Sequence, residues 1–269
     1  MNNCLRNKSR YLWRFIKFLF HSTNRYSIHS PFVYDLIERV IRNRFPVENS
    51  DSIENLRDEL LHSRESIIKI DYGSRAREGK PLSYNVKIRA LVLKSVSSRR
   101  QAGLLYKLAV FMKARSILEF GTSLGLTSAY LGLAAKPGHV ITLEGSPAVA
   151  AIAHQNLYRA GIDNVKVVEG RFDDMLDDIL SQLNRLDLVF LDGDHRKEAT
   201  LHYFNKCLPL IHNESVVVIH DIHNSVGMEE AWQSIRANDN VVVTIDLFKM
   251  GLVFFRKELS KQDFALRYF

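Results

Sequence analysis

The sequence predicts a doubly wound α/β domain over residues 101–269, preceded by a basic, mainly helical extension over residues 1–100. Two observations carry this prediction. From about Leu104 onward, short apolar runs rich in β-branched residues alternate with stretches of helical periodicity, as in a βαβ fold. Residues 1–100 lack this alternation and differ in charge. With 269 residues and 46% hydrophobic content, the chain can bury a sizeable core.

The alternating part contains five expected parallel strands. Their sequences are almost continuously apolar, because a parallel sheet between two helical layers is buried on both faces. They cover residues 116–120, 140–144, 165–168, 186–191 and 215–220. Two further apolar runs, 241–245 and 252–256, are separated by a short turn ending at Gly251 and are expected to form an antiparallel hairpin at the edge of the sheet.

The segments between these strands have the length and periodicity of helices. Each would connect two parallel strands by a right-handed crossover. The expected crossover helices are residues 123–135, 146–160, 173–183, 197–208 and 227–237.

The extension contains two expected helices and one polar loop. Ser30 and Pro31 form a good helix start, because serine caps free backbone N–H groups and proline suits the first turn. A second helix is expected from about Ser52 through Ile68. The basic, glycine-bearing loop at residues 71–81 is predicted to be mobile and is a candidate lid.

The net charge of +7 is unevenly distributed. Residues 1–100 hold 20 Lys/Arg and 10 Asp/Glu, or +10, whereas residues 101–269 hold 17 and 20, or −3. This split indicates an anionic substrate, a membrane surface, nucleic acid or an acidic partner, or else a solvated basic face, since a charge count carries no geometry. The apolar stretch at residues 11–20, with its basic neighbours, is a candidate for weak peripheral membrane contact.

The cysteines and the hydropathy favour a cytoplasmic protein. Cys4 and Cys207 lie far apart without metal-ligand spacing, so neither a disulfide framework nor a zinc site is expected. No apolar run approaches the roughly 18–20 residues of a transmembrane helix. The stretch at residues 11–20 is broken by Arg14 and Lys17 and lacks a cleavage site, so it is not interpreted as a signal peptide.

A glycine-bearing turn follows the first expected strand, at the edge where open α/β sheets bind ligands. Gly121 and Gly125 allow close approach of a ligand, while Thr122 and Ser123 offer hydroxyl groups. The spacing is neither the dinucleotide pattern GxGxxG nor a P-loop. The sequence therefore predicts a ligand-binding turn of another kind.

Acidic and aromatic residues follow the next two strands. Glu144 ends the second strand, where a carboxylate can accept hydrogen bonds from both hydroxyls of a ribose. The third strand leads into residues 169–173, where Phe172 would be an apolar platform for an adenine and Asp173 either an acceptor or a helix cap.

Three motifs together resemble those of class I S-adenosylmethionine-dependent methyltransferases: Glu119-x-Gly121-x-x-x-Gly125, Glu144, and Leu191-Asp192-Gly193-Asp194-His195. Within this class, the motifs are most similar to those of small-molecule O-methyltransferases related to the catechol and caffeoyl-CoA enzymes and to the methyltransferase 24 family. The resemblance covers roughly residues 101–256. It implies a Rossmann-like sheet of seven strands with the last one antiparallel, S-adenosylmethionine as cofactor, and methyl transfer by in-line attack. The cofactor contacts expected on this basis are Glu119, Gly121, Thr122, Ser123, Gly125, Thr127, Glu144, Gly145, Ser146, Phe172 and Asp192.

Carboxylates follow the fourth and fifth strands and are expected to face one crevice. Such oxygen ligands suit a divalent cation, Mg, Mn or similar, and the predicted metal ligands are Asp192, Asp221 and His223. The sequence departs from related metal-dependent enzymes, because Ile222 follows Asp221 and His220 precedes it. His220 or Asn224 are alternative ligands, and imidazole would favour manganese, iron or zinc.

His195 offers an alternative without a metal. Its imidazole can accept a hydroxyl proton near neutral pH, so Asp192 and His195 are the catalytic candidates. The alternative is that the histidines have a structural role and form hydrogen bonds with backbone groups at strand ends.

The sequence thus leads to one main functional hypothesis and two alternatives. The first is O-methylation of a small-molecule acceptor, in a protein expected to be a homodimer. The second is methylation of nucleic acid or of another macromolecule that the basic extension binds. The sequence argues against it, because no Asn/Asp-Pro-Pro-Tyr motif follows the fourth strand. The third is a non-catalytic, cofactor-binding interaction protein.

Overall fold

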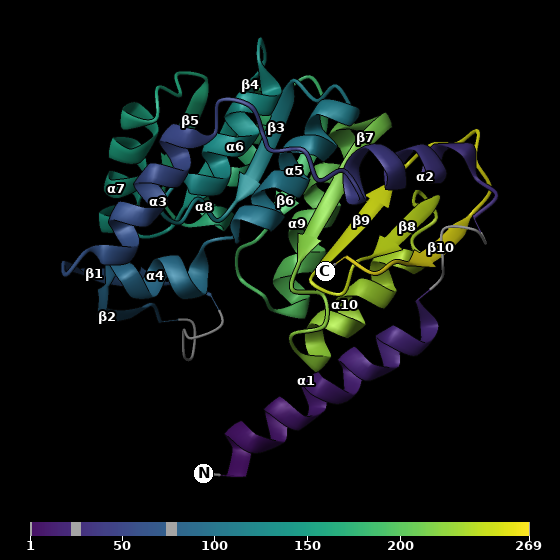
Figure 1. Ribbon diagram of the computed structural model, residues 1–269, viewed down its shortest axis with the longest axis horizontal. Helices are drawn as coiled ribbons and strands as arrows, with labels where there is room; N and C mark the ends of the chain where they lie inside the picture. Colours follow the sequence, from purple (N-terminus) through teal and green to yellow (C-terminus); the bar gives the residue numbers. More distant parts are fainter. Residues whose placement is uncertain (1, 23–27, 74–79, 269) are drawn as a thin grey trace.

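The computed structural model describes residues 2–22, 28–73 and 80–268. Its centre is an eight-stranded sheet with helices on both faces (Figure 1). The strands are β3 (Ser116–Phe120), β4 (His139–Glu144), β5 (Val165–Glu169), β6 (Leu186–Leu191), β7 (Ile211–His220), β8 (Val243–Asp246), β9 (Met250–Phe254) and β10 (Gln262–Ala265). Their order across the sheet is β10-β8-β9-β7-β6-β3-β4-β5.

The sheet confirms the predicted fold class and adds one strand to it. Strands β3 to β7 are mutually parallel, and β9 runs antiparallel between β7 and β8. The predicted C-terminal hairpin is therefore present. Its outer strand does not form the edge, because β10 pairs with β8 in parallel, Gln262 opposite Val243.

Helices cover both faces of the sheet. One face is covered by α5 (Arg99–Phe111), α6 (Leu126–Ala135) and α7 (Pro147–Arg159), the other by α8 (Phe172–Ser181), α9 (Lys197–Cys207) and α10 (Val226–Ala237), with the short 3-10 helix η3 (Leu208–Leu210) before β7. On the first face, α2 (Pro31–Leu36) and the turn η2 (Ile37–Ile41) of the extension also pack against β7, β8 and β9. Successive strand residues face opposite layers, so Ile117 packs in the first core and Leu118 in the second. Each expected crossover helix is present.

The extension is less helical than predicted. It contains α1 (Asn2–His21), α2 (Pro31–Leu36), the π-helical turn η2 (Ile37–Ile41), α3 (Asp51–His62), β1 (Ser66–Asp71), β2 (Leu82–Lys87) and α4 (Ile88–Ser95). The Ser30 start of α2 is confirmed, because Ser30 Oγ accepts a hydrogen bond from the Val33 N–H at 3.4 Å. The prediction of a helix through Ile68 was wrong. That helix ends at His62, and the isoleucines beyond it lie in β1, which pairs with β2 residues 11 to 21 positions away.

Helix α1 lies along the outside of the molecule (Figure 1). Its aromatic residues surround the ring of Phe248 in the turn between β8 and β9, with centroid distances of 5.2 Å for Tyr11, 4.9 Å for Phe15 and 5.3 Å for Phe18. Arg14 forms an ion pair with Glu229 of α10 at 2.8 Å. Within the described residues, no helix combines the length and apolarity needed to cross a membrane.

We expect Gly251→Ala to destabilise the fold by about 1–3 kcal/mol, the usual cost of overpacking a core. A Cβ at this position in β9 would lie 2.5 Å from the ring of Trp232, which is fully buried in α10. Gly227→Ala is the matched control, because its Cβ would lie 3.5 Å from the nearest atom. Urea unfolding of both variants checks the prediction, and equal midpoints would contradict it.

Candidate active site

A cavity of about 420 Å³ lies at the carboxyl ends of β3, β4, β6 and β7. This is the edge where open α/β sheets bind ligands, and the volume suits a small molecule. The predicted site residues that line it are Gly121, Ser123, Glu144, Gly145, Phe172, Asp192, His195 and Asp221.

Two glycines shape the turn between β3 and α6. Gly121 has φ +100°, and a Cβ there would lie 2.7 Å from the carbonyl oxygen of Asp192. Gly125, at φ +78°, would bring its Cβ to 3.2 Å from Ala153 of α7. Positive φ and close packing both require glycine here, so the turn is held against β6 on one side and α7 on the other.

Glu144 joins the turns after β3 and β4. Its two carboxylate oxygens accept the N–H groups of Ser123 and Ser146, each at 2.9 Å. Burial raises the pKa of Glu144, while these two hydrogen bonds and the charge of Lys69 act in the opposite direction. A carboxylate oxygen accepts more than one hydrogen bond, so Glu144 retains acceptor capacity toward the cavity.

Glu119 lies beneath the turn and does not line the cavity. One of its carboxylate oxygens accepts the hydroxyls of Ser128 and, at 2.7 Å, Thr142. The other oxygen, Oε1, is buried without a hydrogen-bond partner among the described residues. Burial raises the pKa of Glu119 to about 8.

Several other predicted cofactor contacts also support the site from behind. Thr122, Gly125, Thr127 and Ser146 are not part of the cavity wall. The Thr122 hydroxyl is hydrogen-bonded to that of Thr142 at 2.7 Å, and Ser146 Oγ accepts the Ile70 N–H at 3.1 Å. By contrast, Ser123 Oγ is buried at the cavity and has no partner within the described part of the chain.

Phe172 forms an apolar wall next to the turn after β6. A Cβ on Gly193 would lie 2.5 Å from its ring, so the absence of a side chain there lets the ring approach the backbone. The ring also contacts Phe120 and Tyr203 edge-on, at centroid distances of 5.6 and 5.8 Å. These contacts fix the ring in one position.

Three side chains meet at the ends of β6 and β7. Asp192 Oδ1 lies 2.6 Å from His220 Nδ1 and 3.7 Å from His195 Nε2. The donor atoms of these three residues all lie within 4.8 Å of one another. Leu191 pairs with Ile219 in the parallel register, which explains why the next residues, Asp192 and His220, are neighbours.

Gln101 contacts the other nitrogen of His220. Its side-chain carbonyl is engaged by the Ser98 N–H and hydroxyl, each at 3.0 Å, in the capping box of α5. Its amide nitrogen therefore points to His220 Nε2, at 3.2 Å, and donates to it. In the neutral ring the proton then sits on Nδ1, facing Asp192.

The neighbours of His220 act on its protonation in opposite directions. Burial lowers the pKa of His220, but the carboxylates of Asp192 and Asp221 outweigh burial and raise it above its usual value. The Gln101 N–H opposes a second proton at Nε2.

The predicted set of Asp192, Asp221 and His223 is not brought together. His223 faces away from Asp192, with Nδ1 3.2 Å from Glu229 and Nε2 2.7 Å from Asp246. Both ring nitrogens are thus occupied. Asp221 lines the cavity but lies 3.9 Å from His220 Nδ1 and 3.7 Å from Lys249 Nζ. His220 takes the place that had been predicted for His223.

The extension supplies a wall of the cavity that the sequence motifs did not indicate. Residues 69–73 and 94–97 line it, together with Tyr84 of β2. A Cβ on Gly145 would lie 2.8 Å from the ring of Tyr72, and the Arg171 guanidinium lies 5.8 Å from the centre of that ring. Of the predicted lid loop, residues 74–79 lie outside the described residues.

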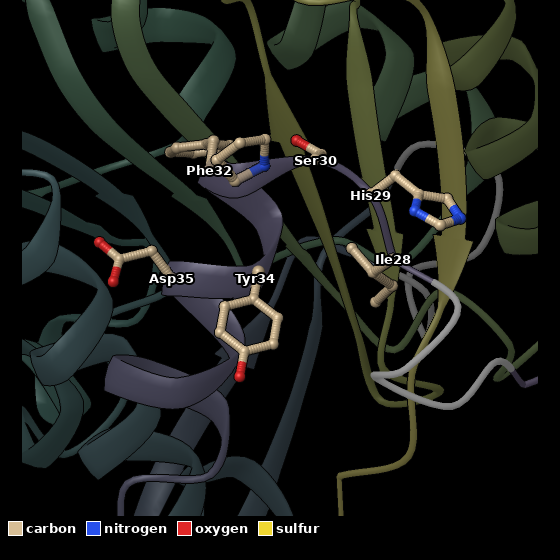
Figure 2. Close-up of a pocket in the computed structure, with 7 residues that line it drawn as sticks. Ile28, His29, Ser30, Phe32, Tyr34 and Asp35 are labelled. Carbon is tan, nitrogen blue, oxygen red and sulfur yellow. The ribbon is translucent and has the colours of Figure 1, made fainter.

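A separate hollow at the start of α2 has none of these features. Figure 2 shows that its side chains point in different directions rather than toward a common centre, with Tyr34 and His29 on different sides of the chain. No binding function is assigned to it.

A family model described as a methyltransferase domain matches residues 118–222, which include the turn after β3, Glu144 and Asp192. The chain is 36% identical over 133 residues to a catechol O-methyltransferase of Mycobacterium tuberculosis, a match that covers 49% of this chain and 59% of that enzyme. The chain thus aligns with under two thirds of the length of this relative.

Solved structures extend the similarity beyond the matched region. The cofactor-bound protein Rv0187 from MTB has a TM-score of 0.54 and 28% identity, with 61% of this chain and 84% of that chain covered. The SAH-bound methyltransferase PaMTH1 of Podospora anserina has a TM-score of 0.60 and 14% identity, with 85% and 97% covered. The latter shows the fold alone.

We expect Glu119 to make the fold less stable as the pH rises from 5 to 8. The folded protein keeps a proton on Glu119 up to a pKa of about 8, whereas the unfolded chain loses it near pH ~4.3. The stabilisation is full below the lower pKa and falls by up to ~1.4 kcal/mol per pH unit as the upper one is approached.

The isosteric variant Glu119→Gln cannot ionise and tests this directly. Its free energy of unfolding should rise relative to the unmodified protein as the pH increases, in urea titrations at pH 5, 6, 7 and 8. Glu169→Gln is the control, because Glu169 is exposed at the end of β5, the second strand from β3 in the sheet. A constant difference for Glu119→Gln across this range would contradict the expectation.

Proposed function

We propose that this protein is an S-adenosylmethionine-dependent methyltransferase that methylates an oxygen atom of a small acceptor. The main observation behind this proposal is that one cavity holds both a cofactor half and an acceptor half of such a site. Glu144 and the unpartnered hydroxyl of Ser123 lie at one end, and the cluster of Asp192, His195 and His220 lies at the other. The similarity to a catechol O-methyltransferase supports the same reaction.

The cofactor half fits a ribose-bearing ligand. Glu144 is held by two backbone N–H groups and keeps acceptor capacity for the ribose hydroxyls. Ser123 Oγ offers a further hydrogen bond at a position that is otherwise buried and unpaired. Phe172 gives a flat apolar surface for an adenine.

The acceptor half can take up the proton that O-methylation releases. The acceptor oxygen forms a bond to the methyl carbon as the carbon–sulfur bond breaks, and the sulfonium becomes a neutral thioether. His195 Nε2, beside Asp192 and partly open to the cavity, accepts the hydroxyl proton, and Asp192 stabilises the resulting imidazolium. The protein otherwise acts by holding donor and acceptor in line.

The same cluster fits a divalent cation. Asp192, His195 and His220 offer one oxygen and two nitrogen donors, and His220 Nδ1 is buried without a hydrogen bond of good geometry in the described residues. To bind an ion through Nδ1, His220 must carry its proton on Nε2 instead, so the Gln101 amide would then have to rotate away from that nitrogen. These ligands suit manganese, iron or zinc better than magnesium. When bound, such an ion would lower the pKa of an acceptor hydroxyl.

Residues 1–100 complete the site in this proposal. Their segments 69–73 and 94–97 form part of the cavity wall, next to residues of the α/β domain at 101–269. We therefore assign acceptor selection to this extension, because fold alone does not set substrate choice.

Replacing Glu144 with Gln should weaken S-adenosylhomocysteine binding by about tenfold or more, since charge-assisted hydrogen bonds contribute ~1.5–3 kcal/mol. Calorimetry on the full chain measures this. Glu169→Gln is the matched control, because Glu169 pairs with Glu144 in the sheet register but lies outside the cavity. Absence of binding by the unmodified protein would refute the proposed function.

Replacing His195 with Gln should lower kcat by about 10²–10⁴-fold, the usual contribution of a general base. Cofactor affinity should stay within about threefold, since His195 acts on the acceptor. Catechol, named for the relative, is the first acceptor to assay, with and without EDTA and added manganese or zinc. His202→Gln is the control, because His202 lies on α9 outside the cavity. An unchanged kcat would exclude His195 as the base.

A further inference from the structure

A second, larger cavity lies on the other side of the α5 start. Its volume is about 1280 Å³, and it is bounded by residues 41–47, one face of α5 and residues 266–268. We call it the basic cavity, because six cationic side chains line it: Arg42, Arg44, Arg99, Arg100, Lys107 and Arg267. None of the described residues in its wall is Asp or Glu.

The cations of the basic cavity are held mostly by neutral groups. Arg267 donates to Ser22 Oγ at 2.7 Å and to the Leu19 carbonyl at 2.9 Å. Lys107 Nζ donates to the Asn43 carbonyl at 2.6 Å, and burial lowers the pKa of this ammonium. These hydrogen bonds orient the side chains and leave their charge uncompensated.

The other cationic side chains of the basic cavity are at least as available to bind an anion. Arg100 stacks over the ring of Tyr268 at 4.5 Å, and Arg42 has only a 4.0 Å contact with Glu38. Arg44 and Arg99 are exposed and make neither a hydrogen bond nor an ion pair within the described part of the chain. Like charges gathered in a concave wall repel one another unless an anion joins them.

The basic cavity is distinct from the proposed methyl-transfer cavity but close to it. Val96 and Ser97 line the methyl-transfer cavity, whereas Arg99 and Arg100 line the basic cavity. Between them stands Gln101, which contacts His220 at 3.2 Å. Residues 96–100 therefore border both cavities, and the N-terminal dipole of α5 adds to the positive potential of the basic cavity.

We propose that the basic cavity binds a small ligand that carries two or more phosphate groups. Arginine recognises phosphate through paired N–H donors, and four or more guanidinium groups spread over one wall suit several phosphates better than one. The concave shape and the volume of about 1280 Å³ favour a compact ligand over an extended polymer. This site is independent of the proposed methyl transfer.

Inorganic tripolyphosphate is the probe, titrated into the full chain by calorimetry at fixed salt. We expect saturable one-to-one binding, weakened about tenfold or more in the double variant Arg44→Glu/Arg99→Glu, since charge-assisted contacts are lost and repulsion is added. Orthophosphate should bind more weakly than tripolyphosphate. Thermal melting verifies that the variants remain folded, which is expected because both positions are exposed.

The control is Arg64→Glu/Arg89→Glu, which makes the same change in net charge at exposed arginines outside both cavities. Its affinity for tripolyphosphate should stay within about threefold of the unmodified protein. Equal weakening in both double variants, or no saturable binding, would overturn the proposal. So would a short RNA that binds through Arg44 and Arg99 while tripolyphosphate does not. None of these measurements involves methyl transfer, so this result and that of the cofactor titration are separable.

Discussion

The contact between Gly121 and the carbonyl of Asp192 is the constraint on which the rest of the site depends. It brings the turn after β3 against the end of β6, closer than any side chain would permit. The turn that would hold the cofactor and the carboxylate that faces the acceptor are thereby fixed relative to each other. In-line transfer requires this fixed relation, because small displacements between reacting atoms cost large factors in rate.

Glu144 fixes the position of residues 1–100 relative to the turn after β3 in a similar way. It binds the turn after β3 through the Ser123 N–H and the turn after β4 through the Ser146 N–H. Ser146 in turn accepts the Ile70 N–H of β1, so the β1–β2 hairpin is tied to the cofactor edge. Burial of one carboxylate among these donors is costly on its own, and the hydrogen bonds offset that cost.

Sequence alone predicts most of the fold and the cofactor edge, because both depend on local patterns. The buried strands are continuously apolar, and glycine at positions 121 and 125 marks backbone that other residues rarely adopt. The β1–β2 hairpin was missed because isoleucines at residues 67–70 fit a helix and a strand equally well until their partners are known. His223 was wrongly placed in the cluster because its partners Glu229 and Asp246 come from other elements. His220 was predicted only as an alternative ligand, and the register of β6 and β7 sets it beside Asp192.

Gln101 links the features that the sequence motifs leave separate. Its backbone and side chain cap α5 through Ser98, and the same side chain fixes the tautomer of His220. The arginines that precede it line the basic cavity. The start of α5 therefore serves two regions of the molecule, since Gln101 sets the tautomer of His220 while Arg99 and Arg100 line the basic cavity.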